Sequence, residues 1–166
     1  TMTALPEPRT SRILERGRYD MPGRAVEPDT PEEIMVFPAG ERRDRLGLAR
    51  WTTDARNPLT ARVAVNRLWE IAFGRGLVLT SEDFGSQGSV PSHPELLDQL
   101  ALDLIESGWD IKAMLERIIG SATYRQDSTT TDDTRRIDPG NALLSRGPAN
   151  RLTAEMIRDQ ALSASG

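Results

Sequence analysis

The sequence contains no cysteine and only one histidine, His93, among its 166 residues. Without cysteine, the chain cannot form disulfides, thiolate metal sites, a cysteine nucleophile or the covalent attachment of haem c. A single histidine also excludes multi-histidine metal sites. No apolar run approaches the roughly 18 residues of a membrane-spanning helix, so we expect a protein that is not membrane-embedded. We therefore predict no metal and no cofactor in this chain.

Lysine is almost absent as well, because Lys112 stands alone beside twenty arginines. The net charge is −4 and the isoelectric point is about 5.1, so nucleic acid is not an expected partner. The arginine excess has two interpretations. It reflects either the codon usage of a GC-rich genome or guanidinium groups that hold buried carboxylates or bind an anion.

The first forty residues contain six of the eleven prolines and predict an extended arm, residues 1–40, followed by a helical domain, residues 41–166. Within the arm, Ser11–Glu15 and Ile34–Phe37 are short enough to be strands, and Met21–Gly23 resembles a turn. The fold class is therefore mainly α, with a compact bundle of about five helices and a small β element in the arm.

Helical spacing of apolar residues begins after Arg43. Asp44 is the expected N-cap of the first helix. Asn57-Pro58 starts a second helix that is apolar on almost every side and therefore central to the fold. This helix is expected to run to Phe73, and Gly74 to end it.

The third helix has the clearest boundaries. Ser92 and Glu95 have the spacing of a capping box, and Gly108 is placed to end the helix. Asp110 then caps a fourth helix, so that the two helices form an αα-hairpin.

The polar residues 127–141 predict a mobile loop, and Thr153 is the expected cap of the last helix. The chain opens without a signal peptide and stops just after that helix. We interpret the chain as an excerpt of a longer protein.

The segment from Gly74 to Pro91 is a candidate functional region, because loops of this length are uncommon unless they are functional or disordered. It is either a site or a connector whose glycines allow close packing. His93 is a candidate general acid or base, with Asp83 and Glu95 as candidate catalytic carboxylates nearby in the sequence.

Three arginines, Arg67, Arg75 and Arg125, are candidates for binding an anionic group such as a sulfated or uronic sugar. The alternative for Arg67 is a structural ion network on the narrow polar stripe of the second helix, since a buried arginine needs a partner. Its expected partners are Glu70, Glu155 or Asp159. The three tryptophans are expected in the core.

Several short strings occur in an order that is typical of one family. They are Arg16-Gly17, Tyr19-Asp20, Pro22-Gly23, Arg45–Trp51, Asn57–Val63, Asn66–Trp69, Phe73–Leu77, Asp83–Gly85, Pro91–Asp98, Ser107–Trp109, Ser121–Gln126, Arg151-Leu152 and Ile157–Asp159. Together they resemble the Planctomycete-specific domain found C-terminal to c-type cytochrome domains, the family catalogued as domain of unknown function fifteen-fifty-three.

This resemblance implies an architecture rather than a reaction. It implies a module of an exported or periplasmic multidomain protein, with haem c held by a domain outside this chain. The other domains of the same polypeptide would be its partners, together with a glycan. Our leading hypothesis is a non-catalytic module that positions partner domains or a glycan. The alternative is an enzyme that acts on anionic polysaccharide, with its site around Gly74–Glu95.

Overall fold

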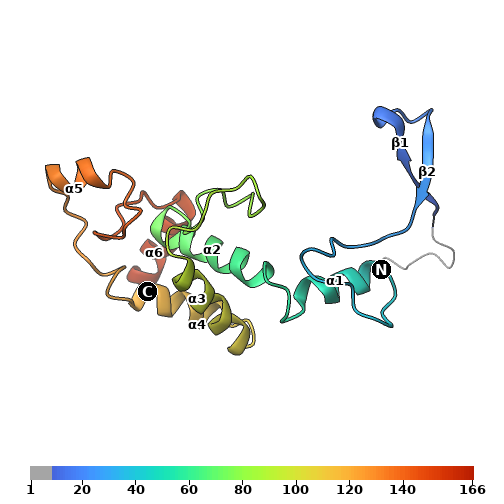
Figure 1. Ribbon diagram of the computed structural model, residues 1–166. Helices are drawn as coiled ribbons and strands as arrows, with labels where there is room; N and C mark the ends of the chain where they lie inside the picture. The colour runs from blue at the N-terminus through green and yellow to red at the C-terminus, as the bar shows by residue number, and fades with distance from the viewer. Residues whose placement is uncertain (1–8) are drawn as a thin grey trace. The chain divides into compact units, whose positions relative to one another are not determined.

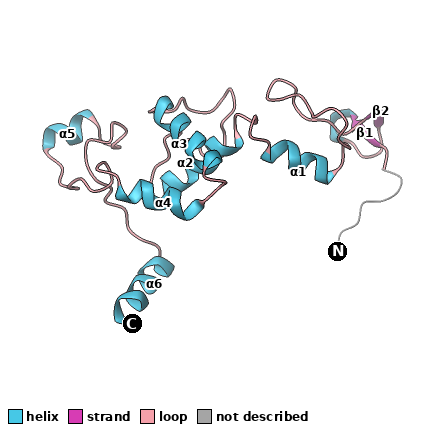
Figure 2. Ribbon diagram, turned by 90° about the horizontal axis from the view of Figure 1, so that it is seen from below, coloured by secondary structure: helices cyan, strands magenta, loops and turns pink. Residues whose placement is uncertain are grey.

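The computed structural model describes residues 9–166 and divides into two units, one ending at Thr60 and the other spanning Ala61–Gly166. Figures 1 and 2 show that helices dominate the part of the chain that is described. It contains six α-helices and one two-stranded antiparallel sheet, so the mainly helical class is confirmed.

The first unit begins with a β-hairpin. Strand β1, Ser11–Leu14, pairs with β2, Pro22–Val26, so that Ser11 lies opposite Val26, and a short 3₁₀ turn over Glu15–Gly17 lies between them. The first predicted strand is thus confirmed, but Pro22-Gly23 begins the second strand rather than forming a turn. The hairpin can close because Arg16 and Gly17 both adopt positive φ angles, which reverses the chain within a few residues.

The second predicted strand, Ile34–Phe37, was wrong, because this segment has no regular structure. Its backbone has a different partner. The indole Nε1 of Trp51 donates a hydrogen bond to the carbonyl oxygen of Met35 at 2.8 Å. Trp51 is 8% exposed, so this bond attaches the segment to helix α1, Arg45–Thr53, instead of to a sheet.

Helices α1 and α2 begin at the predicted side-chain caps. Asp44 Oδ1 accepts the amide of Gly47 at 2.9 Å, which confirms the α1 cap. Helix α2, Thr60–Phe73, starts after Asn57, whose side-chain oxygen accepts the amides of the second and third residues that follow it. Gly74, at a φ of 71°, ends α2 as expected.

Helices α3, Pro94–Glu106, and α4, Ile111–Gly120, form the expected helical hairpin. Gly108 adopts a φ of 69°, and the amide of Trp109 bonds to the carbonyl oxygen of Leu104 at 2.9 Å. This is the Schellman arrangement that ends a helix at a glycine. Asp110 accepts the amide of Ala113 at 3.0 Å and caps α4 as predicted.

The predicted mobile loop at residues 127–141 contains a short helix, α5, Asp132–Ile137, which corrects that expectation. The helix forms because Thr131 and Thr134 bond reciprocally across its first turn, in a capping box that two threonines complete. The last helix, α6, spans Ala154–Ser165, and Thr153 caps it as expected.

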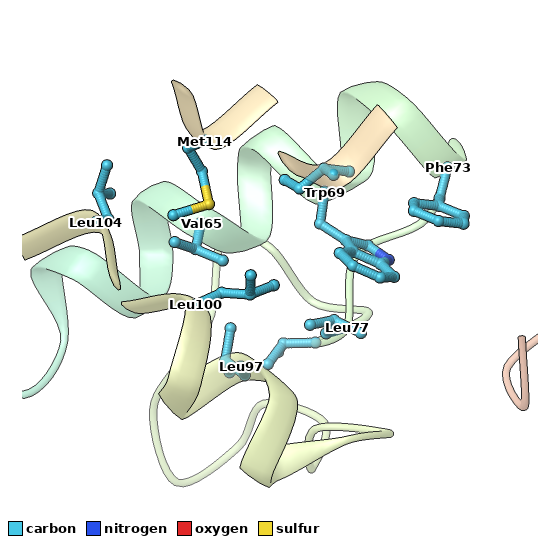
Figure 3. Packing of buried hydrophobic residues seen from close by; sticks show 10 residues of the cluster. Val65, Trp69, Phe73, Leu77, Leu97, Leu100, Leu104 and Met114 are labelled. Atoms are coloured by element: carbon cyan, nitrogen blue, oxygen red, sulfur yellow. The ribbon is translucent and has the colours of Figure 1, made fainter. Parts of the chain in front are cut away.

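The core of the second unit lies where α2, α3 and α4 meet, and Figure 3 shows its side chains pointing toward one another. Trp69 and Phe73 stack with their ring centroids 4.2 Å apart, and both are buried. Leu77 and Val78, just beyond α2, are 2% exposed and belong to the same cluster. The core therefore fixes the start of the segment from Gly74 to Pro91.

Candidate functional site

The most strongly constrained polar residue of the second unit is Asn66, which lies on α2 and has no exposed surface. Its side-chain oxygen accepts the amide of Val78 at 2.8 Å. Its side-chain nitrogen donates to the carbonyl oxygen of Val78 and to the hydroxyl of Ser81, each at 3.1 Å. Asn66 therefore satisfies the backbone of a residue that belongs to no helix or strand.

Glu70 and Gly76 complete this arrangement, which we call the Asn66 clamp. Ser81 donates its hydroxyl hydrogen to Glu70 Oε2 at 2.6 Å, so the carboxylate ends the chain of hydrogen bonds. A Cβ on Gly76 would lie only 2.5 Å from the carbonyl oxygen of Val78 and 2.6 Å from Asn66 Nδ2. Only glycine lets the backbone pass this close to the amide.

The rest of the connector is held by its own short side chains. Thr80 donates its hydroxyl hydrogen to the backbone oxygen of Asp83 at 2.8 Å and accepts the amide of Ser89 at 2.9 Å. Asp83 Oδ1 accepts the amide of Gly85 at 2.9 Å. The predicted catalytic carboxylate Asp83 is thus exposed and used in a turn.

Ser92 does not cap α3, and the predicted capping box with Glu95 was wrong. Both the amide and the hydroxyl of Ser92 donate to the carbonyl oxygen of Leu77, at 2.8 and 3.2 Å. The hydroxyl is committed to this carbonyl, fifteen residues earlier in the chain. His93 is the N-cap instead, without a side-chain capping bond, and the first turn relies on Pro94, which has no amide hydrogen to satisfy.

The three candidate catalytic residues are not joined by hydrogen bonds or ion pairs within the described part of the chain. His93 Nδ1 lies 3.1 Å from the hydroxyl of Ser92. Asp83 bonds to Gly85, and Glu95 is exposed in the first turn of α3. A general base needs an orienting partner or a substrate within hydrogen-bond reach, and the geometry of His93 supplies only a neighbouring serine.

Arg75 is the candidate anion-binding residue with the most enclosed position. It lines a cavity of about 20 Å³ together with Ser92, Trp69 and the segment 140–144, and it donates to the carbonyl oxygen of Gly140 at 3.3 Å. This volume accommodates about one water molecule. A sugar ring does not fit without movement of the surrounding segment.

Arg67 and Arg125 are exposed, and the side chain of neither forms a hydrogen bond or ion pair with another described residue. The expectation of a buried Arg67 was therefore wrong. On the polar stripe of α2, Asn66 is buried and Arg67 is exposed. The alternative ion network is not formed among residues 9–166, since Glu70 accepts the Ser81 hydroxyl and Asp159 lies beside Arg158.

The stripe does contain one ion pair that links two helices. Arg62 Nε on α2 donates to Asp98 Oδ1 on α3 at 2.5 Å. The hydrogen bond from Arg62 lowers the pKa of the Asp98 carboxyl below its ordinary value. Because the side chain of Asp98 is 49% exposed, this pair contributes modestly to stability.

Within residues 9–166, no three histidine or carboxylate side chains lie close enough together to bind a metal ion. None of the helices described has both the length and the apolarity needed to cross a bilayer.

Comparison with known proteins identifies the family. Residues 44–166 match the family described as PSD1, protein of unknown function (DUF1553), and this span is 123 of the 166 residues. The chain belongs to the DUF1553 family. No curated protein and no solved structure matches it significantly. In this DUF1553 chain, the matched span includes both the Asn66 clamp and the candidate residues around His93.

On the polar stripe of α2, the sequence analysis assigns a binding role to Arg67 and none to its neighbour Asn66. The signal for the clamp was present in the sequence. Asn66 is the only amide side chain of α2, and Gly76 follows ten residues later, after the helix ends.

Proposed function

We propose that this DUF1553 chain is a non-catalytic module of an exported, cytochrome-associated Planctomycete protein, in which it positions partner domains or a glycan. Haem c, in this proposal, belongs to another domain of the polypeptide. The proposal rests on the family membership and on one structural observation, which concerns α6.

Helix α6 is capped like the other helices, yet none of its twelve residues is buried. Met156 and Ile157 are 40% and 49% exposed, and Ala161 and Ala164 follow them at helical spacing. We call these four residues the α6 stripe. Exposed apolar stripes of this kind are typical of surfaces that bind another protein element. This supports a docking role for α6 toward a neighbouring domain.

The candidate catalytic residues also favour a non-catalytic role. Asp83 is used in a turn, the hydrogen bond of the His93 ring within residues 9–166 is with Ser92, and the cavity beside Arg75 holds about one water molecule. These contacts stabilise the connector, and the cavity beside Arg75 is too small for a sugar ring.

The docking role is tested in the full polypeptide with two aspartate variants of α6. Ile157 belongs to the stripe, whereas Leu162, which is 55% exposed, lies about 140° away around the helix. We expect Ile157→Asp to release the neighbouring domain and to increase the radius of gyration measured by small-angle X-ray scattering. Leu162→Asp is expected to leave the radius unchanged. Equal radii for wild type and Ile157→Asp would contradict the docking role.

The enzyme alternative predicts a different result. Uronic and sulfated polysaccharides, incubated with the wild-type chain, are expected to show no new reducing ends. Turnover that His93→Ala abolishes without changing the melting temperature would establish the enzyme and overturn our proposal.

A further inference from the structure

A candidate ligand pocket lies in the first unit, away from every residue discussed as a site above. A pocket of about 300 Å³ lies between the segment 28–30, Phe37 and the start of α1. Its apolar surface comes from Pro28, Phe37 and Leu48. Pockets of this volume are at the lower end of those that bind small organic molecules.

The wall of the pocket is held in place by specific contacts. Arg43 forms an ion pair with Asp29, which connects the segment 28–30 to the residues just before α1. A Cβ on Gly47 would lie 2.9 Å from Phe37 Cζ and 2.0 Å from the carbonyl oxygen of Arg42. The aromatic ring therefore packs directly on the backbone of α1, and the pocket is preformed rather than opened by the ligand.

The charges of the wall cancel. The lining residues include two carboxylates, Asp29 and Asp44, and two guanidinium groups, Arg43 and Arg45. Asp29 is paired with Arg43, and Asp44 accepts the amide of Gly47. A charged ligand would be attracted by one pair of these groups and repelled by the other. The wall therefore favours an uncharged ligand.

The shape of the wall favours a planar ligand. The Arg43 guanidinium carbon lies 5.6 Å from the centroid of the Phe37 ring, so a planar cation already stacks over an aromatic ring beside the pocket. A cavity of about 150 Å³ is known to hold benzene. The volume of about 300 Å³ found here has room for two fused rings.

We propose that the pocket formed by Pro28, Phe37, Arg43 and Leu48 binds a neutral, planar aromatic molecule of about ten non-hydrogen atoms. The site is independent of the α6 stripe. A ligand of this size without strong ionic contacts binds with a dissociation constant on the order of 1 mM.

The probe is indole, titrated into the whole chain and followed by amide chemical shifts. We expect saturable shifts confined to the lining residues. Two leucines of α1 provide a matched pair of variants, because Leu48 lines the pocket at 49% exposure and Leu46 lies outside it at 58% exposure. Leu48→Trp fills the pocket and is expected to weaken indole binding at least tenfold. Leu46→Trp adds the same side chain and is expected to retain full binding.

A charge test separates this proposal from an anion site. Indole-3-acetate, which adds a carboxylate to the same rings, is expected to bind several-fold more weakly than indole. Absence of saturable indole shifts would overturn the proposal, as would equal loss of binding in both tryptophan variants or tighter binding of the carboxylate. If Leu48→Trp does not fold, Leu48→Glu gives the same comparison against Leu46→Glu.

Discussion

Replacement of Asn66 is the perturbation that the structure predicts most sharply. Asn66→Ala removes the side chain that satisfies both the amide and the carbonyl group of Val78, and Val78 is 2% exposed. Each buried backbone group left without a partner costs about 1–3 kcal/mol. We therefore expect Asn66→Ala, which leaves two such groups, to lower the free energy of unfolding by about 2–6 kcal/mol, measured by urea denaturation.

A second variant identifies the physical cause. Asn66→Asp keeps the shape and the acceptor for the Val78 amide, but it cannot donate to the Val78 carbonyl oxygen. The Val78 amide should exchange its hydrogen rapidly in Asn66→Ala and remain more protected in Asn66→Asp. Arg67→Ala, at the exposed neighbouring position, is the control and is expected to change stability by less than about 0.5 kcal/mol. A loss below 1 kcal/mol in Asn66→Ala, with unchanged exchange at Val78, would refute the clamp.

Three further results are expected from the same measurements of stability. Gly76→Ala should cost about 1–3 kcal/mol, because its methyl group would lie 2.5 Å from a carbonyl oxygen, whereas Gly120→Ala has open space and should cost nothing. Asp110→Ala should cost about 1 kcal/mol through loss of the α4 cap, and an unchanged urea midpoint would count against that cap. Arg62 lowers the pKa of Asp98, so the pair stabilises the fold above the unfolded pKa of about 3.9. That stabilisation is lost as the pH falls through the lower pKa of Asp98 in the folded protein. The difference in the free energy of unfolding between wild type and Asp98→Asn should therefore disappear in acid. A difference that persists in acid would exclude the ion pair as its cause.

The sequence predicted the helix ends well because most of them depend on contacts within one turn. Asp44, Asp110 and Thr153 each accept an amide three residues later, and Gly108 reverses the chain at the point where its backbone freedom is needed. Such contacts are determined by residues adjacent in the sequence, so reading the sequence alone finds them.

Two of the failures involve partners that are distant in the sequence. Ser92 has the spacing of a cap, but its hydroxyl bonds to Leu77, fifteen residues earlier. The segment Ile34–Phe37 has residues typical of strands, but the indole of Trp51 donates a hydrogen bond to the carbonyl oxygen of Met35. Local pattern carries no information about which distant group competes for a hydrogen bond.

The candidate site was only partly predictable for the same reason. The polar stripe of α2 was recognised, yet a stripe does not tell which of its residues faces the connector. Asn66 faces inward because its short side-chain amide bonds to both the amide and the carbonyl oxygen of Val78. The long side chain of Arg67 reaches solvent instead. The anion-binding roles of Arg67, Arg75 and Arg125 remain predictions.

The proposed docking role requires that another domain cover the α6 stripe of this DUF1553 chain. Hydrogen exchange of residues 154–165 tests it most directly, compared between this chain alone and the full polypeptide. We expect rapid exchange in the chain alone, where every residue of α6 is exposed, and at least tenfold slower exchange in the full polypeptide. Equally rapid exchange of these amides in both would contradict the docking role.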